Sequence, residues 1–310
     1  MTIDVIYTEF AETEAGGVSP LYQRLGLAVS RDDDVLALLG TLAPQKWQPQ
    51  LFFGVVRLLG GPVDDPVLFR EFVLAHWPAI AAEMLVRATQ TNEPGRCAVL
   101  LPVLASLPQP LALLEVGTSA GLCLYPDRYS YRYGATVLGA GDPVIDCSLA
   151  GVAAPSRLPE VVWRAGIDLN PLDVRDPLDV AWLDALIWPE HEHRRARLRA
   201  AAAIAAADPP LLWRGDLADD LLALAAKAPA EATLVVFHTS VLYQVSAEQQ
   251  QRFTALVRTL PGHWLSNDTA DVIPGAPPAP TAAHNLLALD GQPLAWTRSH
   301  GQAMTWIAPE

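Results

Sequence analysis

The spacing of hydrophobic positions changes along the chain near residue 110. From residue 18 to about residue 95, apolar residues recur every three or four positions, which is typical of helices with one buried face. Pro20, Pro49 and Pro66 each suit the first turn of a helix, where a missing N–H group costs nothing. The pattern predicts a helical amino-terminal region, with helices over residues 20–29, 32–42, 49–59 and 66–89.

After residue 110, short apolar runs alternate with helical segments, which predicts a mostly parallel sheet with helices on both faces. Strands are expected over residues 112–116, 161–168, 211–214, 233–238 and 263–267. Helices are expected over residues 179–186, 193–207, 217–228 and 247–259. Closing strands are expected over residues 285–289, 294–299 and 304–307, and Asp290-Gly291 between the first two is a strong hairpin signal.

These elements predict an α/β protein with two parts. Residues 1–95 form the helical region, and residues 96–310 form a Rossmann-like, doubly wound domain. The segment at about 123–160 is too long for a simple crossover, in which the next acidic strand end follows within about 20 residues. Tyr129, Tyr131 and Tyr133 alternate with period two, so we expect an inserted β segment there. Its tyrosines either pack on the main domain or form a substrate-binding flap.

Composition excludes several classes of function. The 310 residues are 51% hydrophobic, enough for a large core, and the formal net charge of −13 disfavours a nucleic-acid partner, whose phosphates need Lys and Arg. The most hydrophobic stretch, residues 98–116, contains three prolines and does not suit a membrane span. Three cysteines without Cys-x-x-Cys spacing and an amino terminus without a secretory pattern favour a cytoplasmic protein.

The segment Glu115–Gly121 carries the strongest chemical signal. It follows the apolar run at residues 111–114 and predicts a buried strand that breaks into a turn, where Gly117 and Gly121 allow sharp curvature and leave backbone N–H groups for a polar ligand. The dinucleotide fingerprint needs no carboxylate two residues before its first glycine, so Glu115 points away from NAD. An ordinary turn after a strand remains the alternative.

Three further residues end predicted strands, and ligands of open parallel sheets bind at such ends. Asp168 suits the hydroxyl groups of a ribose, Asp216 suits an adenine amino group, and His238 suits a general base. Each has a structural alternative. Asp168 is otherwise a loop or helix-cap acceptor, Asp216 is the N-cap of the next helix, and His238 is a hydrogen-bonded structural histidine.

The segment Gln90–Arg96 is dense in polar residues, so Asn92, Glu93 and Arg96 are candidates for an active site or for a capped helix junction. No metal site is expected. His-Glu-x-x-His and phosphate-loop motifs are absent from the sequence, and His191 and His193 sit beside several arginines on what we interpret as a solvated face.

Three motifs together resemble one bacterial family, the domain-of-unknown-function family 2332. They are Gln90-Thr-Asn-Glu-x-x-Arg96, Leu114-Glu-x-Gly-x-Ser-Ala-Gly-Leu122 and Asp127-Arg-Tyr129. The second is similar to the first motif of class I S-adenosylmethionine-dependent methyltransferases, which implies a fold of that type, although the family has no established activity. Ser119 stands where the common motif has its middle glycine. His238-Thr-Ser240 replaces the Asp/Asn-Pro-Pro-Tyr of enzymes that methylate base amines, which argues against a nucleic-acid substrate.

The sequence therefore suggests an S-adenosylmethionine-dependent methyltransferase that acts on a small molecule or a protein side chain, with the helical region as its lid. The expected cofactor-binding residues are Glu115, Gly117, Ser119, Gly121, Asp168 and Asp216. The expected catalytic residues are His238, Asn92, Glu93 and Arg96. A non-catalytic ligand-sensing or partner-binding protein and an NAD-dependent oxidoreductase remain alternatives, and a homodimer is left open.

Overall fold

The computed structural model describes residues 1–281 and 283–307, which form two compact units. The first, here called the helical unit, contains residues 1–91 and 175–196. The second, here called the sheet unit, contains residue 92 to residue 174 and the described chain from residue 197 onward. The sequence prediction divided the chain once, near residue 95, and did not assign the segment 175–196 to the helical unit.

The helical unit confirms the four predicted amino-terminal helices. Its helices are α1 (Ile3–Glu9), α2 (Pro20–Val29), α3 (Asp33–Leu39), α4 (Pro49–Leu58), α5 (Pro66–Val86) and α7 (Pro177–Leu186), with a π-helical turn at Phe10–Glu14 and a 3₁₀ turn at Pro44–Lys46. Ser19, Asp32 and Asp65 cap α2, α3 and α5 by accepting from first-turn N–H groups. α5 departs from helical geometry at His76, two residues before Pro78, as expected where proline removes a hydrogen bond.

Aromatic rings form the core of the helical unit. Phe53 of α4 lies at its centre, with ring centroids 5.1 Å from Tyr22, 5.7 Å from Phe69 and 5.9 Å from Phe10. Gly54 lets α4 approach α7, because a Cβ atom there would lie 3.3 Å from the ring of Trp182. This packing explains why the segment 175–196, distant in sequence, belongs to the helical unit.

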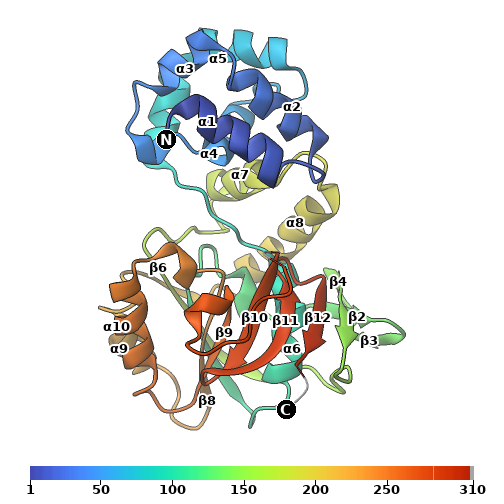
Figure 1. Cartoon of the computed structure of the whole chain (residues 1–310). Coiled ribbons are helices and arrows are strands. Elements are labelled where there is room, and N and C mark those ends of the chain that lie inside the picture. The colour runs from blue at the N-terminus through green and yellow to red at the C-terminus, as the bar shows by residue number, and fades with distance from the viewer. Residues whose placement is uncertain (282, 308–310) are drawn as a thin grey trace. The chain divides into compact units, whose positions relative to one another are not determined.

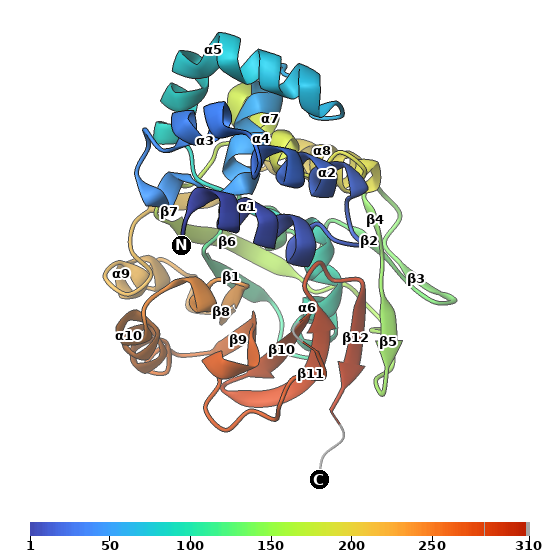
Figure 2. The same ribbon diagram turned by 45° about the horizontal axis from the view of Figure 1, so that its top comes forward.

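The sheet unit contains a nine-stranded sheet in the order β5-β12-β11-β10-β9-β8-β1-β6-β7 (Figures 1 and 2). Its strands are β1 (Leu111–Val116), β5 (Ser148–Ala150), β6 (Val161–Asp168), β7 (Leu211–Arg214), β8 (Thr233–Thr239), β9 (His263–Asp268), β10 (His284–Leu289), β11 (Gln292–Arg298) and β12 (Ala303–Trp306). The strands β7, β6, β1, β8 and β9 are mutually parallel, whereas β10, β11 and β12 add antiparallel pairs. The predicted mostly parallel sheet and its Asp290-Gly291 hairpin are confirmed.

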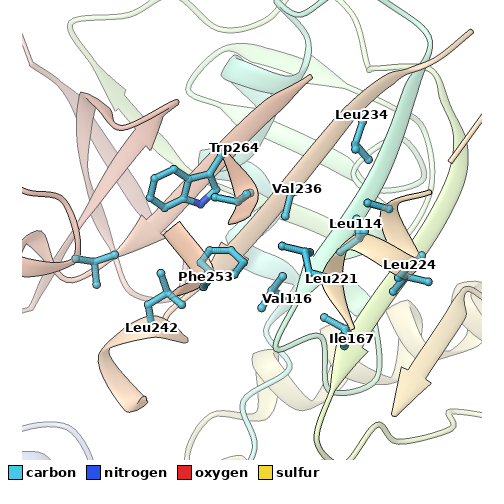
Figure 3. Packing of buried hydrophobic residues seen from close by; sticks show 14 of the residues in the cluster. Leu114, Val116, Ile167, Leu221, Leu224, Leu234, Val236, Leu242, Phe253 and Trp264 are labelled. Carbon is cyan, nitrogen blue, oxygen red and sulfur yellow. The ribbon is translucent and has the colours of Figure 1, made fainter. Parts of the chain in front are cut away.

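The helices of this unit are α6 (Cys97–Leu104), α9 (Leu221–Ala225), α10 (Ala247–Val257) and most of α8 (Glu192–Ala207). Alternate residues of β1 and β8, including Leu114, Val116 and Val236, pack with Leu221 of α9 and Phe253 of α10 (Figure 3). We call this side of the sheet the α10 face. The residues between these positions on each strand, such as Glu115 on β1 and Thr239 on β8, point to the opposite face.

The inserted segment forms a small sheet in the order β3-β2-β4, with β2 at Ser130–Tyr133, β3 at Thr136–Leu138 and β4 at Val144–Asp146. Tyr129, Tyr131 and Tyr133 are buried, and their hydroxyl groups donate to the carbonyl oxygens of Leu122, Pro126 and Ala98. The tyrosines thus pack inside the sheet unit, in agreement with the packing alternative and not with a flap.

A buried carboxylate holds the loop between β8 and α10. Oδ2 of Asp268 is 3.1 Å from Nδ1 of His238 and accepts hydrogen bonds from the backbone N–H groups of Val241 and Leu242, both at 2.8 Å. Burial raises the pKa of Asp268, but the hydrogen bonds and the charge interaction with His238 outweigh burial, so its pKa lies below the ordinary value. The ionised form of Asp268 therefore stabilises the fold.

We expect Asp268→Asn to lower the free energy of unfolding at pH 7 by about 2 kcal/mol, because an amide cannot accept all these hydrogen bonds. A carboxyl group with a lowered folded pKa stabilises the protein above its unfolded pKa of about 3.9, and this contribution is lost as the pH falls through the folded value. The difference between wild type and variant, measured by urea unfolding, should therefore narrow below about pH 4. The exposed Asp271→Asn is the control, and equal stability of Asp268→Asn and wild type at pH 7 would contradict the prediction.

Candidate functional site

The strand order reverses between β1 and β8. β1 is paired with β6 on one side and with β8 on the other, and the chain leaves β1 toward β6 but leaves β8 toward β9. In open parallel sheets, ligands bind outside the carboxyl ends of the strands at such a switch point. The turn after β1 and the loop after β8 therefore frame the candidate site.

The turn after β1 has the backbone geometry that its glycines predict. Gly117 and Gly121 have φ angles of 68° and 75°, and the intervening Ser119 has a φ of 51°. The expectation of free backbone N–H groups in this turn is wrong, since most of them have partners inside the protein. The donors and acceptors are Gly117 N and Thr118 N to Ile167 O, Ser119 N to Asp168 Oδ2, Gly121 N to Thr118 O, and Leu122 N to Asn92 Oδ1.

The turn also lacks a helix behind it. A 3₁₀ turn at Leu122–Leu124 follows, and no α-helix occurs between β1 and β6, a segment that the structure describes completely. A Cβ atom on Gly117 would lie 2.5 Å from Cγ2 of Val241, so the glycine admits a protein side chain from the loop after β8. The turn is therefore not a cradle for phosphate, which needs free N–H groups at a helix N-terminus.

Asp168 ends β6 directly beside this turn. Oδ2 accepts from Ser119 N and Oδ1 accepts from Asn170 N, both at 2.8 Å. The side chain is the loop acceptor that the sequence left as an alternative. It is only half-buried, and each carboxylate oxygen keeps capacity for a second hydrogen bond, so the ribose role stays a prediction.

Asp216 follows β7 and also acts locally. Oδ1 accepts from the N–H group of Ala218 at 2.8 Å and more weakly from that of Asp219 at 3.3 Å. α9 begins at Leu221 after Asp220, so Asp216 stabilises the turn before the helix and is not the N-cap residue itself. Its role toward an adenine stays a prediction.

His238 lies on the α10 face with 0% of its surface exposed. Its ring centroid is 5.8 Å from that of Phe253 and 6.0 Å from that of Trp264, and only Nδ1 has a partner, Asp268, while Nε2 has none among the described residues. A general base must come within hydrogen-bond reach of the proton that it removes. The enclosed imidazole matches the structural alternative and gives no support to a catalytic role.

The polar segment before the sheet ties distant parts of the sheet unit together. Asn92 holds the glycine turn from both sides, since Nδ2 donates to Thr118 O at 3.0 Å and Oδ1 accepts from Leu122 N at 3.1 Å. Oε1 of Glu93 accepts from Gly95 N at 2.9 Å and pairs with Nε of Arg197 in α8 at 2.8 Å. Asn92 and Glu93 are therefore positioning residues in this structure.

Arg96 connects the end of β8 to the loop between β11 and β12. Nη1 donates to the carbonyl oxygen of Thr239 at 2.9 Å and to its Oγ1 at 3.2 Å, and Nε donates to Ser299 O at 3.0 Å. The backbone of the β11–β12 loop also lies against the residue before Arg96, because a Cβ atom on Gly301 would collide with the carbonyl oxygen of Gly95. This loop carries no motif, so its contact with Arg96 was not predicted from the sequence.

Glu115 points to the same face as Thr239 and is 3% exposed. Oε2 accepts from Oγ1 of Thr118 at 2.8 Å. Burial raises the pKa of Glu115 well above its ordinary value, more than the hydrogen bond from Thr118 and the charge of Arg96 lower it. Burial therefore favours the neutral, protonated form of this carboxyl group.

Asp268 is the strand-end residue that the sequence reasoning most clearly missed. It ends β9 as Asp168 ends β6, so the same strand-end rule that selected Asp168 would have found it. No cluster of three or more potential metal ligands occurs among the described residues, and no described helix is both long and apolar enough to cross a membrane.

Comparison with known proteins supplies the relationship but no activity. No curated protein and no solved structure matches the chain. A family model described as "Uncharacterized protein conserved in bacteria (DUF2332)" matches residues 5–306, and therefore covers the helical unit, the inserted small sheet and the antiparallel end of the large sheet. The chain belongs to this bacterial family, DUF2332.

Proposed function

We propose that the sheet unit has the methyltransferase type of Rossmann-like fold, that it binds S-adenosylmethionine at the carboxyl ends of β1, β6 and β7, and that the protein is a methyltransferase. One observation carries the proposal. An acidic residue lies at or near the carboxyl end of each of these three neighbouring strands: Glu115 one residue before the end of β1, Asp168 at the end of β6, and Asp216 two residues after β7. The N–H groups of the adjoining glycine turn mostly have protein partners.

This combination favours a cationic ligand over an anionic one. S-adenosylmethionine carries a sulfonium and an ammonium group, which carboxylates attract, and a ribose whose hydroxyl groups need acceptors. A dinucleotide carries a pyrophosphate, which needs N–H donors and is repelled by carboxylates. The oxidoreductase alternative is therefore the weaker one.

The proposed contacts follow the strand order. Asp168 accepts from the ribose hydroxyl groups with the lone pairs that its two backbone partners leave, and Asp216 lies toward the adenine. Gly117, Ser119 and Gly121 shape the turn beside the methionine end. Methyl transfer depends mainly on positioning of the two reactants, so it does not require His238 as a base. The substrate class is a small molecule or a protein side chain.

The enclosed His238 also favours a second candidate, a protein that binds the same ligand without catalysis. In that case the site senses an adenosyl compound and transfers no methyl group. Ligand binding is common to both candidates, so binding is tested first, and methyl transfer from labelled S-adenosylmethionine then separates them.

Calorimetric titration with S-adenosylhomocysteine and with NAD tests the ligand class. We expect S-adenosylhomocysteine to bind at least about tenfold more tightly than NAD, a difference of about 1.4 kcal/mol, because the site lacks donors for pyrophosphate. Tighter binding of NAD, or no binding of the adenosyl ligand, would remove the proposal.

Adenosine and 2′,3′-dideoxyadenosine test the role of Asp168. We expect wild type to prefer adenosine by about 10-fold or more, because a hydrogen bond to a charged group contributes about 1.5–3 kcal/mol. Asp168→Asn should lose most of this preference, whereas Asp271→Asn should keep it. If Asp168→Asn discriminates between the two nucleosides as well as wild type does, Asp168 is only a loop acceptor.

A further inference from the structure

Two buried ionisable side chains of the sheet unit, Arg96 and Glu115, have no ionic partner among the described residues. Four side chains of Arg and Glu are buried in the described chain: Glu93, Arg96, Glu115 and Arg164. Arg164 forms a two-fold pair with Asp127, at 2.9 and 2.7 Å, and Glu93 pairs with Arg197 at 2.8 Å. Arg96 and Glu115 make only the hydrogen bonds to uncharged groups given above, and no ion pair joins them to each other within the described residues.

The guanidinium group of Arg96 is only partly used. Its hydrogen bonds involve Nε and Nη1, and no described residue accepts a hydrogen bond from Nη2. A buried cation without a counter-ion is costly, because hydrogen bonds to neutral groups replace water only in part. The arrangement leaves Nη2 available to an anionic group.

Asn267 provides an independent second donor. It is paired in register with Thr239, so the two side chains lie on the same face as neighbours. Its Oδ1 accepts from Thr297 Oγ1, but the fully buried Nδ2 has no partner among residues 1–281 and 283–307. Arg96, held on Thr239, and Asn267 thus each keep a donor without a partner at the carboxyl end of β8.

Glu115 lies on the neighbouring strand of the same face. It is paired with Phe237, and Thr239 is two residues further along β8, a diagonal of about 8 Å between Cα atoms at normal strand spacing. The charge of Arg96 acts on the carboxyl group of Glu115, which places the two in one electrostatic environment. A cationic guanidinium group and a buried carboxyl group therefore lie on the same face of the sheet at the switch point.

We propose that Arg96, Glu115 and Asn267 bind the α-amino acid end of the adenosyl ligand, with its carboxylate on Arg96 and Asn267 and its ammonium group on Glu115. This inference rests on the proposed function and assigns the methionine end of that ligand. An α-amino acid group carries both charges on neighbouring atoms, so one ligand supplies the two missing partners at once.

Removal of the amino acid end of the ligand tests the inference without any variant. We expect wild type to bind S-adenosylhomocysteine about 10–100-fold more tightly than 5′-methylthioadenosine, which keeps the adenosyl part alone. Equal affinities would overturn the inference and leave the proposed function standing. If neither ligand bound, the inference and the proposed function would both be overturned.

Variants of Arg96 test the carboxylate contact. Arg96→Gln should lower the affinity for S-adenosylhomocysteine by about 10–100-fold and change that for 5′-methylthioadenosine less than about twofold. Arg96→Lys keeps the charge, so its affinity for S-adenosylhomocysteine should lie between those of wild type and Arg96→Gln. The exposed Arg132→Gln is the control and should bind both ligands as wild type does. Equal losses for both ligands in Arg96→Gln and Arg96→Lys would show a merely structural role.

Proton release tests the ammonium contact. The titratable groups that act on Glu115 are Arg96, Cys123 and Asp168, and burial keeps its pKa raised in the free protein. A bound ammonium group favours the ionised carboxylate, so binding should release up to about one proton at a pH between the pKa values of Glu115 in the bound and the free protein. Calorimetry in buffers of different ionisation enthalpy measures this release, which should vanish in Glu115→Gln and with 5′-methylthioadenosine. Equal release by wild type and Glu115→Gln would remove Glu115 from the site.

Discussion

The carboxyl edge of the sheet depends on one constraint, the need of buried backbone N–H groups for acceptors. The loops after β1 and β8 are too tight to pair all their own N–H groups, and side chains supply the rest. Asp168 serves the turn after β1, and Asp268 serves the loop after β8. Asn92 reaches the first turn from before the sheet. These contacts hold the loops that frame the switch point.

The same contacts decide which ligands suit the edge. Each N–H group that is bound to Asp168, Asn92 or a backbone carbonyl is unavailable to phosphate, while each carboxylate adds negative charge beside the turn. A tight glycine turn is thus compatible with a site that disfavours anions. Its glycines admit protein atoms, of which Val241 against Gly117 is the clearest case.

The sequence predicted most elements whose hydrophobic pattern is local. β6 and β7 match their predicted bounds, because each is a short, mostly apolar run between residues that interrupt helices and strands. α6 was not predicted, since it is apolar on all sides and contains Pro102. The partners of the site residues were beyond sequence reasoning, because Asn92 meets Thr118 and Arg96 meets Thr239 only after the strands are ordered. A glycine turn looks the same whether its N–H groups are free or paired.

Arg96 is a buried cation without an ionic partner among the described residues, and its position at a helix terminus makes it still less favourable. It is the N-cap residue of α6, and the dipole of a helix disfavours a cation there. Folding alone would favour a neutral or acidic residue at this position, such as the asparagine or aspartate that commonly caps helices. A ligand carboxylate would offset both the guanidinium charge and the helix terminus. The proposed ligand would therefore stabilise the protein most at a position that is unfavourable in its absence.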